Sequence, residues 1–181
     1  TALYAGWSKW PSMSLAANGG FFKIVNSSTG EVVAQDQTSW TTDFAPSAAV
    51  YPGVVHYWRD GYLFVVYVGR PGYTIQGWTG SRPVNSSTGV VSVRNGESYK
   101  ADWKASPYTI AFDTQCDLDV ADVSATYDQD VTLPAPPERK GYIFNGWNTE
   151  ADGSGELYEA GVALEKPNLA ESGTMTLYAQ W

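Results

Sequence analysis

Hydrophobic and aromatic residues along this chain fall in short runs of strand length, each bounded by Gly, Pro or Asp. The runs at 108–112, 141–147 and 174–181 are rich in β-branched and aromatic residues, and each predicts a β-strand. A longer run at 56–68 is divided by Arg59-Asp60-Gly61. Because Asp-Gly tolerates the positive φ of a tight turn, this run predicts a hairpin.

Helical periodicity is not a feature of this sequence. No long stretch repeats hydrophobic residues at the spacing of an amphipathic helix. The best candidate, 160–172, is interrupted by Pro167, which removes a helical hydrogen bond. The pattern therefore predicts a mainly β fold with small α+β character at most.

Two motifs recur along the chain in the same order. Gly-Tyr-x-x-x-Gly-Trp occurs twice, and an Ala-x-Trp ending occurs three times. The first motif aligns Gly72, Tyr73, Gly77 and Trp78 with Gly141, Tyr142, Gly146 and Trp147. The second aligns Trp103 with Trp181, and it aligns Leu3, Tyr4 and Trp7 with Leu177, Tyr178 and Trp181. A repeated order of motifs predicts tandem modules.

Module boundaries follow from this order. Residues 1–12 are expected to be the terminal strand of an upstream module followed by a linker. Residues 13–106 form a module with an insertion at about 31–69, and residues 107–181 form a second, more compact module. An export signal is expected outside this sequence, because no signal-peptide pattern is present in it.

Composition excludes several classes of partner. The chain has 181 residues and a formal net charge of −8, which repels the phosphates of a nucleic acid. Its apolar runs are far shorter than the roughly 18–20 residues of a spanning helix, so no membrane insertion is expected. The single cysteine, Cys116, has no second cysteine for an internal disulfide or a metal cage.

The second module resembles a known family. Its segments at 108–113, 137–149 and 177–181 together resemble the Listeria–Bacteroides repeat, also called the internalin B-repeat, over 108–181. Residues 13–104 resemble a divergent copy, through Ser14–Gly20 and Arg70–Trp78. The resemblance implies β-grasp-like modules, extracellular or on a bacterial cell surface, that act as spacers or adhesive segments without catalytic residues.

One departure from the family pattern concerns the turn after the first strand. The family shows Asn-Gly-Gly there, as the first module does at 18–20. The second module has Thr114, Gln115, Cys116 and Asp117 in this region, so its opening turn is expected to differ.

Aromatic side chains divide into repeated and non-repeated ones. We expect the repeated residues to pack the core: Trp78, Trp103, Trp147 and Trp181. Each aromatic ring that enters a core removes about 150–250 Å² from water. The competing interpretation is sugar binding, because Trp rings also stack on sugars. Non-repeated aromatics are better candidates for a binding site, and they lie in the insertion: Trp40, Tyr51, Tyr57, Trp58, Tyr62 and Tyr67. Of these, Trp40, Tyr57, Trp58 and Tyr62 are the predicted binding residues, with packing of the insertion's own core as the competing interpretation. Tyr57 and Trp58 point to opposite faces of a strand, so one of them at most faces a given ligand.

Catalytic and metal sites are not indicated. The only histidine, His56, lies in a predicted strand without an identifiable partner nucleophile. Acidic residues between 113 and 130 invite a calcium interpretation, but their spacing matches no calcium-binding loop, and solvated loops explain them better. The Asn-Ser-Ser-Thr-Gly sequences beginning at Asn26 and Asn85 fit a glycosylation sequon and also a hairpin turn, which we favour. No catalytic residue, cofactor or metal is therefore predicted.

The expected function is that of a non-catalytic tandem repeat segment. It would serve a bacterial cell-surface or secreted protein as a spacer or stalk, with any adhesion or protein interaction in the insertion. The alternative is a carbohydrate-binding accessory segment of a secreted glycosidase. Expected partners are a host or cell-wall glycan, a surface protein, and neighbouring modules of the same chain.

Overall fold

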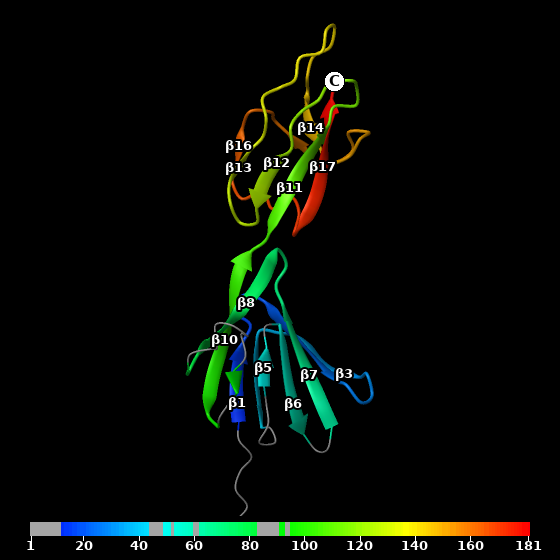
Figure 1. Ribbon diagram of the computed structural model, residues 1–181. Coiled ribbons are helices and arrows are strands. Elements are labelled where there is room, and N and C mark those ends of the chain that lie inside the picture. The colour runs from blue at the N-terminus through cyan, green and yellow to red at the C-terminus, as the bar shows by residue number, and fades with distance from the viewer. Residues whose placement is uncertain (1–11, 44–48, 52, 60–61, 83–90, 93–94) are drawn as a thin grey trace, which may run out of the picture. The chain divides into compact units, whose positions relative to one another are not determined.

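The computed structural model describes residues 12–43, 49–51, 53–59, 62–82, 91–92 and 95–181. These residues form strands and no helix, which confirms the prediction of a mainly β chain (Figure 1). The chain divides into two compact units, unit 1 at Thr1–Lys104 and unit 2 at Ala105–Trp181. The predicted upstream strand with Leu3, Tyr4 and Trp7 lies outside the described residues.

The described part of the chain contains no helix long and apolar enough to cross a membrane.

Unit 1 contains a four-stranded sheet in the order β4-β1-β10-β8. Its strands are β1 (Ser12–Ala16), β4 (Ser39–Asp43), β8 (Tyr73–Gly80) and β10 (Glu97–Ala105). The first strand, β1, pairs in parallel with the last, β10, and antiparallel with β4. In Figure 1, β1 and β10 lie side by side. The two segments of the sheet's centre are thus more than eighty residues apart in sequence, as Met13 and Glu97 show.

A second, six-stranded sheet in unit 1 has the order β3-β2-β7-β6-β5-β9. Its strands are β2 (Phe21–Asn26), β3 (Val32–Gln37), β5 (Ala49–Tyr51), β6 (Val54–Arg59), β7 (Tyr62–Gly69) and β9 (Val91–Ser92). The predicted hairpin at 56–68 is confirmed by the antiparallel β6–β7 pair, although residues 60–61 lie outside the described part. Four of these strands lie within the expected insertion at 31–69, and β2 and β9 flank it.

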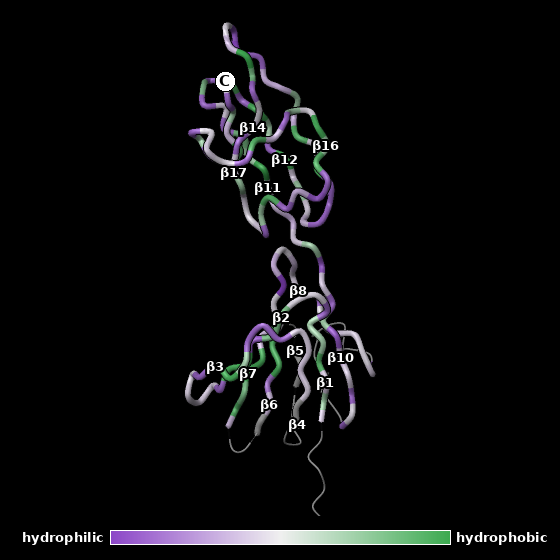
Figure 2. Tube along the Cα trace, turned by 180° about the vertical axis from the view of Figure 1, so that it is seen from behind, coloured by the Kyte–Doolittle hydropathy of each residue, from purple (hydrophilic) through white to green (hydrophobic). Residues whose placement is uncertain are grey.

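The core of unit 1 draws side chains from both sheets. Alternate residues point inward, as the period of two along a strand requires. The buried residues include Met13 and Leu15 from β1, Phe22 and Ile24 from β2, Val55 and Tyr57 from β6, Val66 from β7, Trp78 from β8 and Tyr99 from β10. Strands β2 and β7, which supply part of this core, are largely hydrophobic in Figure 2.

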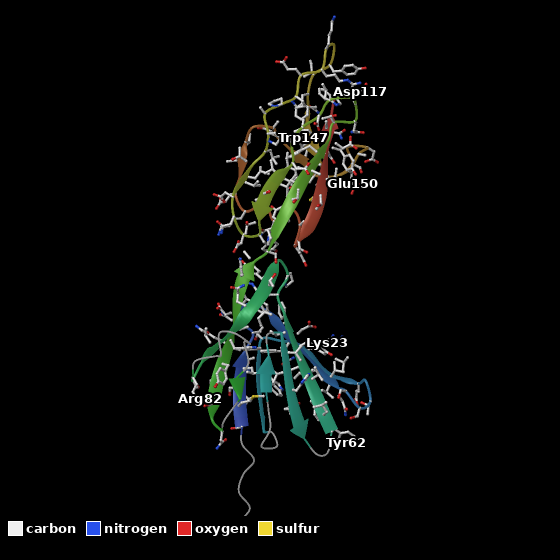
Figure 3. The ribbon with its side chains drawn as sticks, viewed as in Figure 1. Lys23, Tyr62, Arg82, Asp117, Trp147 and Glu150 are labelled. Atoms are coloured by element: carbon white, nitrogen blue, oxygen red, sulfur yellow. The ribbon has the colours of Figure 1, made fainter. Side chains whose placement is uncertain are left out.

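Unit 2 contains a five-stranded sheet in the order β12-β11-β17-β14-β15 and a separate two-stranded pair, β13-β16. The strands are β11 (Pro107–Asp113), β12 (Val123–Thr126), β13 (Val131–Thr132), β14 (Gly146–Asn148), β15 (Leu157–Tyr158), β16 (Ala163–Leu164) and β17 (Gly173–Gln180). Trp147 lies in the interior of this unit, whereas Asp117 and Glu150 lie at its periphery (Figure 3).

The two units share one strand plan. In each, the first strand pairs in parallel with the last, β1 with β10 and β11 with β17. In each, the outer edge of the first strand takes an antiparallel partner, β4 or β12. The strand with the Gly-Trp motif lies beside the last strand, as β8 or β14. Unit 1 therefore has the plan of unit 2 with a second sheet added.

Candidate functional site

The repeated tryptophans at the ends of the last strands make the same contact in both units. The indole Nε1 of Trp103 donates a hydrogen bond to the carbonyl of Ala17, 2.8 Å away. The Nε1 of Trp181 donates to the carbonyl of Thr114, also 2.8 Å away. Ala17 and Thr114 each directly follow the first strand of their unit. The last residue of the motif thus fastens the last strand to the end of the first.

The turn after the first strand also repeats, although its sequence does not. Asn18 (φ 51°) donates from Nδ2 to the carbonyl of Ala101 (2.9 Å), and Gln115 (φ 54°) donates from Nε2 to the carbonyl of Ala179 (2.8 Å). The expectation that the two turns differ is wrong at this position, because Gln115 adopts the same left-handed backbone as Asn18 and reaches the equivalent carbonyl. The turns do differ one residue later, where Gly19 has φ 90° and Cys116 has no positive φ.

An arginine stacked on the motif tyrosine is a third repeated contact. The guanidinium carbon of Arg70 lies 3.5 Å from the ring centre of Tyr73, and that of Arg139 lies 3.8 Å from the ring centre of Tyr142. In each unit, the tyrosine amide donates to the arginine carbonyl at 3.1 Å. Arg139 also lies 5.4 Å from the ring centre of Trp181, which extends this cation–π cluster.

The segment from Gly141 to Trp147 corrects one sequence prediction. Only Gly146–Asn148 is a strand there, instead of the expected 141–147. The turn closed by Arg139 and Tyr142 takes the chain away from the sheet, and Ile143 is 86% exposed. Local stacking and turn formation therefore outweigh the β propensity of this stretch.

The motif tryptophans Trp78 and Trp147 lie in the two cores, at 3% and 0% exposure. Trp147 packs against Phe112 and Phe144, with ring centres 4.6 and 5.2 Å away. The structure therefore places these repeated side chains where they pack the fold and where no ligand reaches them.

A site with the geometry of a ligand pocket lies in unit 1 and involves the insertion. It has a volume of about 520 Å³, within the range of about 300–1,000 Å³ that small-molecule pockets occupy. Its lining consists of Ile24, Asn26, Val33, Ala34, Gln37, Trp40, Tyr57, Tyr62 and Phe64. Every one of these side chains is uncharged.

Two hairpins and one strand of the other sheet position the pocket's side chains. The β2–β3 hairpin closes through the Asn26–Gly30 loop, where the Gly30 amide donates to the Asn26 carbonyl (2.8 Å). This confirms the predicted turn at 26–30, whereas the one beginning at Asn85 lies outside the described residues. Register shifts between β2 and β3 and the positive φ of Asp36 (57°) mark a bulged edge strand.

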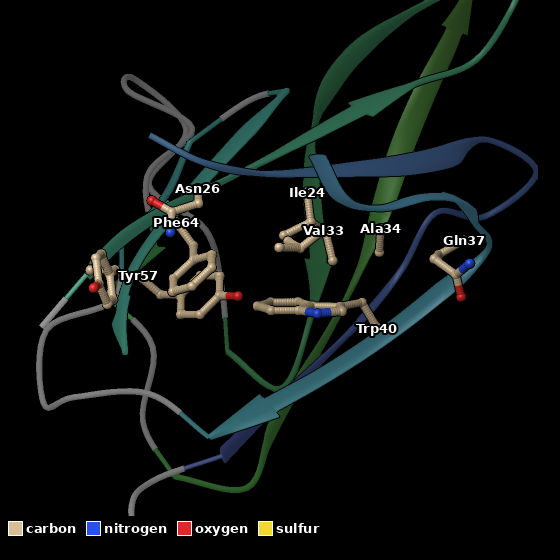
Figure 4. A pocket seen from close by; sticks show the side chains of 9 residues that line it. Ile24, Asn26, Val33, Ala34, Gln37, Trp40, Tyr57 and Phe64 are labelled. Carbon is tan, nitrogen blue, oxygen red and sulfur yellow. The ribbon is translucent and has the colours of Figure 1, made fainter. Parts of the chain in front are cut away.

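Aromatic rings form one side of the pocket. The ring centres of Trp40 and Tyr57 lie 4.9 Å apart at a tilt of 48°, and those of Tyr57 and Phe64 lie 5.1 Å apart and nearly parallel. Figure 4 shows the Trp40 ring beside Ile24 and Val33, with Tyr57 and Phe64 on one side and Gln37 on the other. Trp40 comes from β4, which pairs with β1, so both sheets of unit 1 contribute to the site.

The structure brings three of the four predicted binding residues to this pocket: Trp40, Tyr57 and Tyr62. Tyr57 is only 4% exposed and belongs to the core, so it supports the pocket wall more than it offers a surface. Tyr62, at 48% exposure, lies at the rim and at the start of β7 (Figure 3). The side chain of Trp58 lies outside the described part of the chain, as does that of Tyr51.

Several lining residues were missed by sequence reasoning: Ile24, Asn26, Val33, Ala34, Gln37 and Phe64. A signal was present, because Phe22, Ile24 and Asn26 alternate along β2 and all three are buried. Asn26 was interpreted as a turn residue only, and its place at the end of an inward-facing row was overlooked.

Titratable groups with shifted pKa values lie away from this pocket. Burial, aided by a hydrogen bond to Glu156, raises the pKa of Tyr158 to about 12. Burial also raises the pKa of Tyr108 and of Tyr99. Two hydrogen bonds from Ser154 lower the pKa of Asp152. These shifts follow from packing and local loop contacts in each case.

Acidic side chains in unit 2 fasten loops. Asp113 Oδ1 accepts from the Gln115 amide (2.7 Å), and Asp130 Oδ1 accepts from the Lys166 amide (3.2 Å). Among the described residues, no group of three or more His, Cys, Asp or Glu side chains is arranged to hold a metal ion.

Unit 2 is similar in sequence to a known family of repeat domains. Residues 108–180 match the family model of the Listeria-Bacteroides repeat domain. The predicted resemblance is thereby confirmed for this stretch. Gln115 and Arg139 lie within the matched stretch and Trp181 directly follows it, and unit 1 reproduces the contacts of all three with Asn18, Arg70 and Trp103.

Two relatives are much longer than this chain, and both come from Evansella cellulosilytica. One, named "Putative Gly-rich membrane protein", is 32% identical over 182 residues, which is 99% of this chain and 17% of the relative. The other, named "Putative membrane protein", is 37% identical over 81 residues, which is 45% of this chain and 11% of the relative. This chain thus spans less than a fifth of the length of either relative.

Proposed function

We propose that this chain is a non-catalytic segment of a cell-envelope protein, in which the shared module plan acts as a spacer and the insertion of unit 1 carries recognition. The observation behind this proposal is that repeated and non-repeated aromatic residues lie in different places. The repeated residues are occupied by contacts that both units share, through Trp103 and Trp181 above all. The aromatic residues described in the pocket lining, in contrast, are all non-repeated.

The non-catalytic part of the proposal rests on the pocket's chemistry. Acid–base and nucleophilic catalysis generally use a carboxylate, imidazole, thiol or amine near the reacting atoms, either as the reacting group or to activate a hydroxyl. The lining supplies amides, phenols, an indole and aliphatic groups. Such a site binds and orients a ligand, and it leaves the ligand's bonds intact.

A second candidate is the accessory segment of a secreted glycosidase. It is favoured by one observation, the aromatic pocket, because such accessory segments hold an enzyme on its polysaccharide through aromatic side chains. In this case, the catalytic centre belongs to another part of the parent protein. The two candidates predict the same behaviour for this chain and differ in the activity of the protein that carries it.

Tyr62 and Tyr67 provide a matched test. Both lie on β7 with nearly equal exposure, 48% and 47%, and only Tyr62 lines the pocket. The full chain, Tyr62→Ala and Tyr67→Ala would be screened against wall polysaccharides, host glycans and surface proteins. We expect a specific ligand whose binding falls at least fivefold in Tyr62→Ala and is retained in Tyr67→Ala.

The opposite outcomes are equally definite. Loss of binding in Tyr67→Ala alone would place recognition on the other face of the sheet and refute the pocket. A clean negative across the screen would remove recognition from the proposal and leave the spacer. Release of soluble products from a polysaccharide by the purified chain would refute the non-catalytic part.

A further inference from the structure

The pocket in unit 1 is lined by a largely buried asparagine whose side-chain N–H group faces no acceptor among the described residues. Asn26 is 8% exposed, and its Oδ1 accepts a hydrogen bond from the Ser28 amide at 3.0 Å. Its backbone amide and carbonyl are also paired, with Glu31 and Gly30. Within the described residues, its Nδ2 donates to no acceptor, and Asn26 nevertheless lines the pocket. Figure 4 shows this amide nitrogen on the side of the aromatic rings.

An unpaired donor that loses its water when the pocket is filled selects among ligands. A purely apolar occupant would leave the Nδ2 group without water and without an acceptor, which is costly in a desolvated site. An occupant with a hydroxyl or carbonyl at this point would satisfy it. The pocket therefore discriminates in favour of a ligand that carries an acceptor among apolar surfaces.

A second amide lies at the other end of the pocket. Gln37 donates one Nε2 hydrogen to the carbonyl of Gln35 at 2.9 Å, and its Oε1 accepts from no described residue and can meet a ligand. The pocket thus offers a donor at Asn26 and an acceptor at Gln37, with the Trp40 ring between the aliphatic and aromatic walls (Figure 4). A hydroxyl group both donates and accepts, so a ring with several hydroxyls suits both ends.

Charge narrows the ligand class further. None of the described lining side chains carries a charge, so a carboxylate, phosphate or ammonium group would lose water against them without gaining an ionic partner. A neutral ligand with an apolar face and hydroxyls at its edge fits all of these features. Uncharged pyranose sugars have this combination.

We infer that the pocket binds an uncharged pyranose, with the sugar's apolar face on the Trp40 indole and its hydroxyls paired with Asn26 Nδ2 and Gln37 Oε1. This inference rests on the proposed function and names the ligand class of its site. The volume of about 520 Å³ accommodates a monosaccharide unit, either free or at the end of a glycan. An apolar side chain from a partner protein is the competing occupant.

The test uses isothermal titration calorimetry on the full chain with defined probes. These are a set of neutral methyl pyranosides, including methyl β-glucoside and methyl N-acetylglucosaminide, together with glucuronic acid and cyclohexylmethanol. We expect at least one neutral pyranoside to bind, with glucuronic acid at least tenfold weaker than its neutral counterpart. Cyclohexylmethanol should bind more weakly than that pyranoside, because it cannot occupy both amides.

Variants assign the binding to the named groups. Trp40→Ala should weaken the pyranoside at least tenfold, which corresponds to about 1.4 kcal/mol. Asn26→Asp keeps an oxygen for the Ser28 amide and removes the donor, so it should weaken the pyranoside at least fivefold without unfolding the loop. Tyr67→Ala is the control on the same sheet and should leave the affinity unchanged.

Three results would overturn the inference. One is cyclohexylmethanol binding at least as tightly as every pyranoside, and another is Asn26→Asp with unchanged pyranoside affinity. The third is an absence of pyranoside binding while a protein ligand found in the screen depends on Tyr62. That last result would refute the sugar and leave the proposed recognition function intact.

Discussion

Two tryptophans of unit 2 should respond to mutation in the reverse order of their burial. Trp147 is fully buried, yet its Nε1 meets no acceptor among the described residues. Trp181 is only half-buried, yet its Nε1 donates to the Thr114 carbonyl at 2.8 Å. Substitution with Phe keeps a ring in place and removes the N–H group in both cases. The comparison therefore sets the loss of a paired N–H group against the loss of an unpaired one.

The magnitudes follow from these two environments. Trp147→Phe removes an uncompensated buried donor, a gain of about 1–3 kcal/mol, and opens a small cavity that costs about 1–2 kcal/mol. Its net effect should lie between a loss of about 1 kcal/mol and a gain of about 2 kcal/mol in stability. Trp181→Phe loses the hydrogen bond and leaves the part-buried Thr114 carbonyl unpaired, at a cost of about 1–3 kcal/mol. Trp147→Ala, in contrast, should cost about 3–5 kcal/mol through its cavity.

Urea unfolding followed by the amide NMR signals of β11 and β17 reports on unit 2 alone. We expect the midpoint of Trp181→Phe to fall further below wild type than that of Trp147→Phe. A Trp147→Phe variant less stable than Trp181→Phe by more than about 1 kcal/mol would refute the reasoning. It would mean that the indole N–H of Trp147 is satisfied in solution.

Two further predictions concern packing and pH. Gly20→Ala should destabilise unit 1 by about 1–3 kcal/mol, because the added Cβ would lie 2.4 Å from the Gly69 carbonyl oxygen and 2.8 Å from the Trp103 ring. Gly69→Ala is the control: its Cβ would meet nothing within 4 Å, so its thermal unfolding should match that of the wild type. The pKa of Tyr158 is raised to about 12, so its contribution to stability should be complete below about pH 10 and lost as the pH rises toward 12. Tyr158→Phe should therefore flatten the curve of unfolding free energy against pH between these values. A curve that is unchanged in this variant would contradict the assigned shift.

Sequence patterns predicted the module plan because its defining residues are repeated. The Gly-Trp motifs and the Trp endings indicate the order of the strands. Trp78 and Trp147 are both buried in the core of their unit, so the positions of these motifs mark equivalent strands. The equivalence of Gln115 with Asn18 could not be predicted, because it depends on how far each side-chain amide extends toward the last strand. A Gln one methylene longer than Asn finds the same carbonyl of the last strand.

The candidate site was predictable only in part. Non-repeated aromatics indicated Trp40 and Tyr62, since a shared scaffold does not require them. Their convergence on Asn26 and Gln37 depends on the bulged register of β3 on β2 and on the pairing of β4 with β1. These are contacts between distant segments, and local propensity carries no information about them.

The parallel pairing of first and last strands has a mechanical consequence. In unit 2, β11 and β17 run side by side from Tyr108↔Gly173 to Asp113↔Tyr178, so the chain enters the ladder at one end and leaves it at the other. Tension applied along the chain then loads these hydrogen bonds in shear, all together, instead of opening them one by one. The pair β1 and β10 carries the same load in unit 1. Each module is thus built to resist pulling along the direction in which its chain runs.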